Sequence, residues 1–333
     1  MTKIVCLGET LLRYATARGH RFKDLAFTLC VGGCETNVAV SLSQFNFDTV
    51  LVTKLPNHGL GDGIMSFLSS YGVNTDHIVR TSDRIGSYYL EMGSGNRPSS
   101  VIYDRSYSAM TTFSLDDVDL DELFKDANYF MTSGITAALG ETVKNALIKM
   151  MKYCRDKGIT VVYDVNYRAK MWSQEACGQA LKEIIPYVDI LSAGILDAEN
   201  FLGLKSYYES YEDQLECYYK QIMTLYPNIK YITSTKRDII SSSVNDLTGY
   251  LYDGHLYHSD TYHIDDIIDR VGGGDAYMAG ILYGLCTYED VQNTVSFATA
   301  AAVLKHSIYG DANQVSVNEV EAFIANGTNR IQR

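Results

Sequence analysis

The stretch "DRVGGGDAYMAG", residues 269–280, places three successive glycines directly before an aspartate and an apolar run. Glycine in an ordered element costs conformational entropy, so three in a row need a reason in the backbone. An extended segment precedes the glycines, and apolar residues at helical spacing follow them. The stretch therefore predicts a short strand, a glycine turn and the N-terminus of a helix.

A helix N-terminus carries unpaired N–H groups and the positive end of the helix dipole, which together bind anions. Without Cβ atoms, Gly272, Gly273 and Gly274 can close their N–H groups around a phosphate oxygen. We expect a methyl group at Gly273 to occupy that space. Asp275 would then be a base that takes a proton from a hydroxyl attacking the phosphate. The alternative is a glycine turn with a capping aspartate. The string does not match a dinucleotide-binding fingerprint or a Walker A loop.

Composition narrows the class of protein. The 333-residue chain has a net charge of -12 and no long basic run, which argues against a nucleic acid or an anionic membrane as partner. An anionic small ligand would need a strong local positive site. The seven cysteines lack metal-type spacing and are expected to be reduced thiols of a cytoplasmic protein. No leader or membrane-length apolar run is apparent, so we expect a soluble, intracellular protein.

Strand patterns alternate with helical patterns along most of the chain. "KIVCLG" and "ITVVYDVNYR" are typical of strands, and "CETNVAVSLSQF" is typical of a helix. The alternation predicts an α/β fold with a doubly wound, mostly parallel sheet flanked by helices. Ligands then bind beyond the carboxyl ends of the strands. Residues 11–32 and 86–112 break the alternation and are predicted to form a small β-sheet lid on a single domain, 1–333. We also expect a homo-oligomer joined through the lid sheet.

A second glycine string, "VGGCETNVA", places Gly32 and Gly33 before a helix with Asn37 in its first turns. By itself a tight turn would explain it. Together the two strings resemble the paired signatures of the PfkB (ribokinase-like) carbohydrate kinases, G-G-x-x-x-N and D-x-x-G-x-G-D. The resemblance spans the whole chain. It implies a ribokinase-like fold with ATP and Mg²⁺ as cofactors, an anion hole at residues 272–274, Asp275 as catalytic base, and Gly32, Gly33 and Asn37 at the sugar site.

Arginines distinguish a sugar acid from a neutral sugar, because a carboxylate is gripped best by a guanidinium. "VIYDRSYSA" and "YDVNYRAKMW" each place an arginine near the expected site. These stretches look most like 2-keto-3-deoxygluconate kinases within the family. That resemblance assigns to the acid sugar Tyr89 (or its neighbour Tyr88), Tyr103, Arg105, Arg168 and Asp311. A packing role for Tyr103 and a solvated role for each arginine are the alternatives.

Two stretches depart from the family pattern. The N-x-x-E segment falls on "LSAGILDAE", where Gly194 replaces Asn and Asp197 replaces Glu. The stretch 234–243, "STKRDIISSS", lacks the usual glycine. The ATP contacts that the resemblance implies are Ser234, Lys236, Arg237, Gly272 and Gly274. Both departures concern metal and ATP geometry and leave the anion hole and the base intact.

The function that this resemblance implies is ATP-dependent phosphorylation of O6 of 2-keto-3-deoxygluconate. One alternative is a fructokinase- or ribokinase-type enzyme for a neutral sugar. Another is a catalytically silent sugar-binding regulator on the same scaffold, since fold does not guarantee activity.

Overall fold

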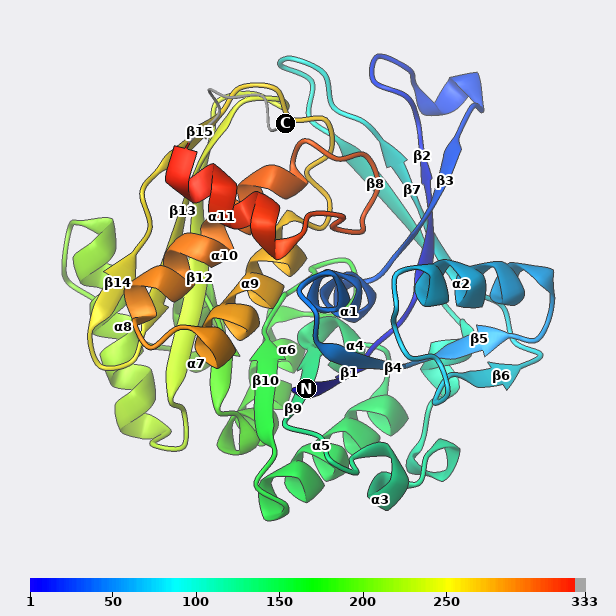
Figure 1. The fold of residues 1–333 in the computed structure, drawn as a ribbon, viewed down its shortest axis with the longest axis horizontal. Coiled ribbons are helices and arrows are strands. Elements are labelled where there is room, and N and C mark those ends of the chain that lie inside the picture. Colours follow the sequence, from blue (N-terminus) through cyan, green and yellow to red (C-terminus); the bar gives the residue numbers. More distant parts are fainter. Residues whose placement is uncertain (327–333) are drawn as a thin grey trace.

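A nine-stranded sheet lies at the centre of the computed structural model, which describes residues 1–326 (Figure 1). Its order is β14-β13-β12-β11-β10-β9-β1-β4, with β15 paired to β13. The strands are β1 (Lys3–Leu7), β4 (Asp48–Val52), β9 (Tyr129–Ser133), β10 (Thr160–Asp164), β11 (Ile190–Ser192), β12 (Tyr231–Ile239), β13 (Asn245–Tyr252), β14 (Leu256–His258) and β15 (Tyr262–Ile264). The pairs from β4 to β12 are parallel, and β13 pairs antiparallel with β12, β14 and β15. The predicted mostly parallel sheet is confirmed.

Helices cover both faces of this sheet (Figure 1). One layer holds α1 (Cys34–Gln44), α9 (Gly273–Thr287), α10 (Val291–Lys305) and α11 (Val317–Asn326), and the other holds α5 (Glu141–Asp156), α6 (Gln174–Ile184), α7 (Ile195–Leu202) and α8 (Tyr211–Leu225). The remaining helices are α2 (Gly59–Ser70), α3 (Leu120–Leu123) and α4 (Gly134–Ala137). Side chains of β1 alternate between the layers: Ile4 and Cys6 pack with α1, and Val5 and Leu7 with α5. All four are fully buried, as expected of a parallel strand covered on both faces.

A second sheet of four strands, called here the small sheet, stands apart from the main one within the described part of the chain (Figure 1). Its order is β3-β2-β7-β8, with bounds β2 (Leu11–Ala15), β3 (Thr28–Gly32), β7 (Gly86–Glu91) and β8 (Ser100–Asp104). β2–β3 and β7–β8 are antiparallel hairpins, and β2 and β7 join them in parallel. Both segments predicted to leave the main sheet form this small sheet.

Two strands are shorter than predicted. The apolar run "TVLVTKL" divides into β4 and β5 (Lys54–Pro56), and β5 pairs with β6 (Val79–Thr81) in a separate ribbon. The strand predicted for "ITVVYDVNYR" ends at Asp164, because Asn166 takes a left-handed conformation, φ 39°. Such backbone cannot continue a strand. Residues 165–173 therefore form a loop at the carboxyl end of the sheet.

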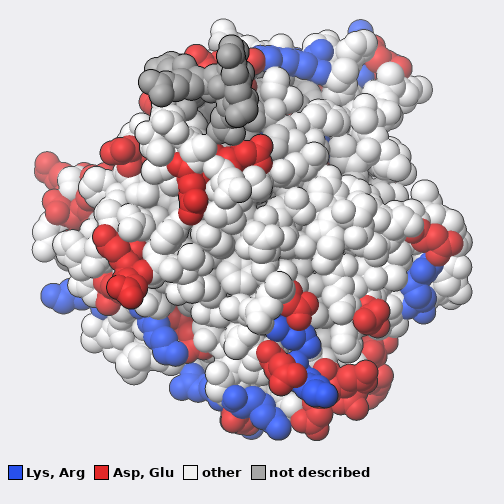
Figure 2. Space-filling view, viewed as in Figure 1, with Lys and Arg blue, Asp and Glu red and all other residues white. Residues whose placement is uncertain are grey.

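Charge is unevenly distributed over the surface of the molecule (Figure 2). In Figure 2, charged side chains lie mainly around the edge of the face shown, and the area around α1 is largely uncharged. Within residues 1–326, no helix is long and apolar enough to span a membrane.

Candidate active site

The glycine string at 272–274 forms the start of α9, as its sequence predicts. Gly272 precedes the helix in a left-handed conformation, φ +83°. A Cβ atom at this position would lie 2.0 Å from the carbonyl oxygen of Asp311. Any other residue would therefore meet both backbone strain and a clash. The turn holds the first N–H groups of α9 against the loop that carries Asp311.

The N–H groups of this turn are mostly unpaired. The N–H of Gly273 donates to the carbonyl of Arg270 at 3.3 Å, whereas those of Gly272, Gly274 and Asp275 have no hydrogen-bond acceptor within residues 1–326. They lie at the positive end of a 15-residue helix. The arrangement can accept an anion.

The expectation that a methyl group at Gly273 would displace a phosphate oxygen is wrong. A Cβ atom there would point into the protein and lie 2.7 Å from the ring of His306. At Gly274 a Cβ atom would meet nothing within 4 Å. Gly274, which lines the cavity described below, is the position where an added methyl group would reach ligand space.

Asp275 occupies the first turn of α9 and is held by α1. Its Oδ2 accepts a hydrogen bond of 2.7 Å from Nδ2 of Asn37. Burial raises the pKa of Asp275 to about 7, against the hydrogen bonds from Asn37 and Cys34, and the nearby charge of Asp164 raises it further. A carboxylate with a pKa near the working pH suits a general base.

Asp275 lines a cavity of about 450 Å³ beneath the small sheet, called here the inner cavity. Of the residues predicted from the sequence, the inner cavity is lined by Gly33, Asn37, Tyr103, Arg105, Arg168, Arg237, Gly272, Gly274, Asp275 and Asp311. Gly32 and Gly273 lie behind its wall. The fold thus brings together segments that are more than 200 residues apart in the sequence.

The "GG" pair at 32–33 shapes one side of the inner cavity. A Cβ atom on Gly33, which has φ +133°, would lie 2.2 Å from the carbonyl oxygen of Glu9. A Cβ atom on Gly32 would lie 2.2 Å from Oδ2 of Asp311. The pair lets the start of α1 approach both carboxylate-bearing residues. Gly33 lines the inner cavity, whereas Gly32 lies behind its wall against Asp311.

A larger cavity of about 770 Å³ lies at the carboxyl ends of β10, β11 and β12, called here the strand-end cavity. It is lined by the predicted nucleotide residues Ser234, Lys236 and Arg237, together with the two departures Gly194 and Asp197. Asp164, Asn166, Arg168 and Arg237 line both cavities. The two spaces therefore meet close to Asp275.

Strand pairing decides which tyrosine faces the inner cavity. Across the small sheet, one row of paired residues is Cys30, Arg13, Tyr88 and Tyr103, and the next is Leu29, Tyr14, Tyr89 and Ile102. Tyr88 and Tyr103 line the cavity, whereas Tyr89 stacks on Tyr14 with ring centroids 5.1 Å apart on the opposite face. The choice of Tyr89 as a sugar contact does not fit this geometry, because its neighbour Tyr88 is the one that lines the cavity.

Arg105 lines the inner cavity but is already paired. Its Nε donates to Oε2 of Glu9 at 2.8 Å, and its Nη2 makes a second, shorter contact with the same oxygen. Both side chains are buried, with 9% and 2% exposed. The charge of the Arg105 guanidinium is therefore already balanced by Glu9. Its remaining nitrogen, Nη1, contacts Met171.

A buried charge network lies behind Asp311. Arg13, with no exposed side chain, binds Oδ2 of Asp269 at 2.6 Å and Oδ1 of Asp311 at 3.0 Å. The hydroxyl of Tyr88 donates to Oδ2 of Asp311 at 2.8 Å. Burial raises the pKa of Asp311, and the charge of Arg13 opposes that rise. The network fixes the Asp311 carboxylate at the cavity wall.

Three arginines of the inner cavity, called here the cavity arginines, have no carboxylate partner within residues 1–326: Arg168, Arg237 and Arg270. Arg168 donates only to the carbonyls of Asn166 and Tyr167, at 3.3 and 3.0 Å. Burial lowers the pKa of Arg237, and the nearby Arg270 lowers it further. Nε of Arg237 is buried without a hydrogen-bond partner. The cavity thus has the local positive site that an anionic ligand needs in an acidic protein.

The other predicted nucleotide residues are partly engaged. The hydroxyl of Ser234 accepts a hydrogen bond of 2.7 Å from Tyr219. Nζ of Lys236 lies 3.3 Å from Asp238 and 5.1 Å above the ring of Tyr211. Lys236 is therefore the more adaptable of the two, since this surface contact is weak.

The two departures from the family pattern form a small unit at the start of α7. Oδ2 of Asp197 accepts the N–H of Gly194 at 2.7 Å. Burial raises the pKa of Asp197 to about 6. Over residues 1–326, no group of three or more His, Cys, Asp or Glu side chains is arranged to hold a metal ion.

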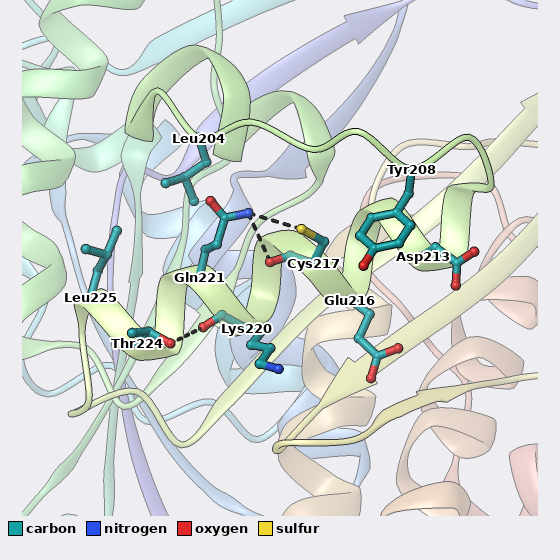
Figure 3. A pocket seen from close by; sticks show the side chains of 9 residues that line it. All are labelled: Leu204, Tyr208, Asp213, Glu216, Cys217, Lys220, Gln221, Thr224 and Leu225. Atoms are coloured by element: carbon teal, nitrogen blue, oxygen red, sulfur yellow. Dashed lines mark hydrogen bonds between the residues drawn. The ribbon is translucent and has the colours of Figure 1, made fainter.

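A further cavity of about 780 Å³ lies along α8, away from these residues (Figure 3). The amide of Gln221 donates to the carbonyl and the Sγ atom of Cys217, and Thr224 donates to the carbonyl of Lys220. Gln221 and Thr224 thus direct hydrogen bonds to their own helix. Volume alone does not make this cavity the functional one.

Several site residues escaped the sequence reasoning. Arg13 sits between apolar residues in "LLRYA", and a charged residue inside a strand could have indicated a buried role. Asp164 ends the observed strand β10, where ligand-binding side chains are expected, but the predicted strand ran on to Arg168. Glu9 and Arg270 carry no comparable pattern. Their roles depend on contacts with segments distant in the sequence.

Comparisons with known proteins agree with this architecture. Residues 1–317 match the family described as "pfkB family carbohydrate kinase". The chain is similar to a 2-dehydro-3-deoxygalactonokinase of Haloferax volcanii, 30% identical over 334 residues that cover 99% of each chain. It is also similar to a 2-dehydro-3-deoxygluconokinase of Bacillus subtilis, 24% identical, covering 95% of this chain and 93% of the relative. The crystal structure of a 2-dehydro-3-deoxygluconokinase from Thermotoga maritima has a TM-score of 0.94 and 36% identity, covering 98% and 100% of the two chains. The chain belongs to the PfkB family of carbohydrate kinases.

Proposed function

We propose that this protein is an ATP-dependent kinase of a 2-keto-3-deoxy sugar acid, with 2-keto-3-deoxygluconate as substrate and its 6-phosphate as product. The observation that carries the proposal is the meeting of two cavities beside Asp275 and the unpaired N–H groups of α9. Similar proteins are named 2-dehydro-3-deoxygluconokinase, which supports the substrate class.

In the proposed reaction, the sugar lies in the inner cavity and its terminal hydroxyl points to Asp275. Asp275 accepts the hydroxyl proton as the oxygen attacks the γ-phosphorus of ATP. The new O–P bond forms as the bond to the β,γ-bridging oxygen breaks, and ADP leaves. The N–H groups of Gly272, Gly274 and Asp275 stabilise the charge on the transferred group.

The carboxylate of the sugar needs a cation that is not already neutralised. Arg105 is occupied by Glu9, whereas Arg168 has no carboxylate partner in the described structure. We therefore assign the carboxylate primarily to Arg168, with Tyr88 and Tyr103 along the sugar. Asp311 would accept sugar hydroxyls, because Arg13 favours its charged form and holds it in place.

ATP would occupy the strand-end cavity, with Ser234, Lys236 and Arg237 on its wall. Mg²⁺ would enter with ATP and neutralise charge on its phosphates. Asp164 and Asp197 offer the oxygen ligands that Mg²⁺ prefers. Burial raises the pKa of both carboxylates, so a nearby cation would favour their charged forms. This pair replaces the N-x-x-E pattern that the sequence lacks.

The proposal includes closure of the small sheet over the bound sugar, which would keep water from the phosphoryl group. It also includes a homo-oligomer joined through the outer face of that sheet. Leu29 and Ile102 on this face are 47% and 52% exposed, beside the Tyr14–Tyr89 stack. Covering such a row is favourable. A cytoplasmic location would fit the need for ATP and the free thiols seen in the structure.

The test is ATP consumption with purified protein over a panel of sugars. The panel contains 2-keto-3-deoxygluconate, its C4 epimer 2-keto-3-deoxygalactonate, fructose and ribose. The epimer is included because a similar protein is named for the galacto compound. A preference for either keto-deoxy acid supports the proposal and fixes the epimer. A preference for fructose or ribose would contradict the acid assignment, and binding without turnover would indicate a silent regulator.

A further inference from the structure

A buried lysine outside both cavities has no role in the reaction described above. Lys305 is the last residue of α10, and its side chain is fully buried. Within residues 1–326 it has no carboxylate partner at ion-pair distance, because Asp269 and Asp311 are bound to Arg13. A buried charge without a partner is costly, so its retention calls for an explanation.

The ammonium group of Lys305 binds backbone carbonyls instead. Nζ donates to the carbonyl oxygen of Asp269 at 3.3 Å and to that of Ile308 at 3.1 Å. Asp269 begins the glycine turn, and Ile308 lies in the loop that leads to Asp311. Cε of Lys305 would be 3.2 Å from a Cβ atom on Gly272, so the stem lies directly beneath the turn. One side chain therefore connects the two loops that form the wall around the N-terminus of α9.

The same two loops are joined at other points, which shows how closely they depend on each other. Oδ2 of Asp269 accepts the N–H of Gly310 at 3.1 Å, and the N–H of Asp269 donates to the carbonyl of His306 at 3.2 Å. Arg13 also bridges these loops, through the side chains of Asp269 and Asp311, whereas Lys305 binds their backbone carbonyls. Burial lowers its pKa, whereas the charges of Asp269, Asp311 and Asp275 oppose the decrease. The two hydrogen bonds place the amino group of Lys305 behind the anion-binding turn.

We propose that Lys305 is a positioning residue, a built-in cation that fixes the anion-binding turn 269–275 to the loop 306–311 and adds positive charge behind it. It touches neither cavity and acts through the backbone of Gly272 and the N–H groups beyond it. A corollary concerns the space it fills. Two carbonyl oxygens facing a removed ammonium group would bind a small monovalent cation in its place.

The experiment compares wild type with Lys305→Ala, which opens the space, and Lys305→Met, which keeps most of the volume without the charge. Turnover, which rests on the proposed function, is measured with the preferred sugar in NH₄Cl, KCl, LiCl and tetramethylammonium chloride at equal ionic strength. We expect kcat of both variants to fall about 10- to 100-fold, with the sugar KM changed less than about threefold, because the turn that receives the phosphate loosens. NH₄⁺ and K⁺ should restore kcat of Lys305→Ala at least several-fold, and should not restore Lys305→Met.

The melting temperature tests cation binding without requiring enzyme turnover. A ligand that binds only the folded state raises Tm. NH₄⁺ and K⁺ should therefore raise Tm of Lys305→Ala more than Li⁺ or tetramethylammonium does, with no such selectivity in wild type or Lys305→Met. Lys54, whose Nζ lies 3.0 Å from Asp117 in another part of the fold, provides the control. Lys54→Ala should lose stability without cation-selective recovery of kcat.

The following outcomes would overturn the proposed role of Lys305. Wild-type kcat in Lys305→Ala, or a loss of kcat and Tm that no cation selectively reverses, would overturn the inference. If Lys305→Ala does not fold, an unchanged kcat in Lys305→Met would overturn it as well. If wild type turns over no sugar, the proposed function fails, and the cation dependence of Tm alone then decides the role of Lys305.

Discussion

The arginines around Asp275 fall into two groups, one paired with carboxylates and one without such partners. The arginines nearest the small sheet are paired: Arg105 with Glu9, and Arg13 with two carboxylates. The cavity arginines, two of which also line the strand-end cavity, have no carboxylate partner in the described chain. A paired wall is rigid before any ligand arrives, whereas an unpaired cationic wall is completed by the ligand. In the proposed reaction, the paired arginines hold part of the sugar site in shape, and the cavity arginines bind the negative charges of the sugar acid and ATP.

The difference also predicts which mutations lower stability and which weaken ligand binding. Removing one member of a buried pair strands the other and costs stability. Removing one of the cavity arginines relieves a desolvation cost, so its main effect should be on ligand binding. The four experiments below test this contrast, beginning with the residue at the meeting point.

Asp275→Asn should lower kcat by about 10²- to 10⁴-fold, the contribution of a general base. The amide keeps the shape and the contact with Asn37 but accepts no proton. Steady-state kinetics measures kcat, and calorimetry measures sugar affinity. We expect the affinity to stay within a few-fold of wild type. Asp266→Asn is the control, since its side chain is 74% exposed. Substantial turnover by Asp275→Asn would remove Asp275 from the role of base.

Arg168→Ala should lower kcat/KM on the acid sugar by about 10²- to 10³-fold, because the carboxylate loses its bidentate partner. Arg168→Lys should restore only part, since an ammonium group cannot form the same fork. Activity on fructose, however low, serves as the internal comparison. An equal loss on both sugars would assign Arg168 to the phosphoryl group, which its position between the cavities allows.

Arg13→Met and Arg237→Met should differ in kind. Arg13→Met leaves Asp269 and Asp311 buried without their cation, so the free energy of unfolding should fall by about 3–5 kcal/mol. Arg237→Met should leave the melting temperature unchanged or higher, while KM for ATP rises about tenfold. Chemical denaturation and ATP kinetics on both variants provide the measurements. Destabilisation by Arg237→Met equal to that of Arg13→Met would end the contrast between the two walls.

Asn37→Ala should shift the pH profile. In wild type, kcat should rise with pH through about 7 as Asp275 loses its proton. The amide of Asn37 stabilises the charged form and lowers the pKa of Asp275, so its removal should move the rise to higher pH. A hydrogen bond to a charged group is worth about 1.5 kcal/mol, equivalent to about one pH unit. Asn57→Ala, on an exposed loop, should show the wild-type profile. A rise that stays at the wild-type pH in Asn37→Ala would mean that another group titrates.

Local sequence patterns were sufficient to predict the two sheets of the fold. Alternating strand and helix patterns predicted the parallel sheet, and the turn-rich inserts predicted the small sheet. The boundaries were less accurate where a single residue decides, as at Asn166, whose left-handed backbone ends β10 two residues earlier. Periodicity reports average burial along a segment and carries no information about one dihedral angle.

For the site, the sequence by itself determined the residue types that chemistry requires: glycines at a helix start, an aspartate beside them and arginines for an anion. Those depend on local backbone freedom and on the charge of each side chain. Only the tertiary structure decided which arginine is free, that Tyr88 rather than Tyr89 faces the cavity, and that Lys305 lies beneath the glycine turn. Pairing, facing and burial arise from contacts between segments distant in the sequence, so no single stretch can specify them.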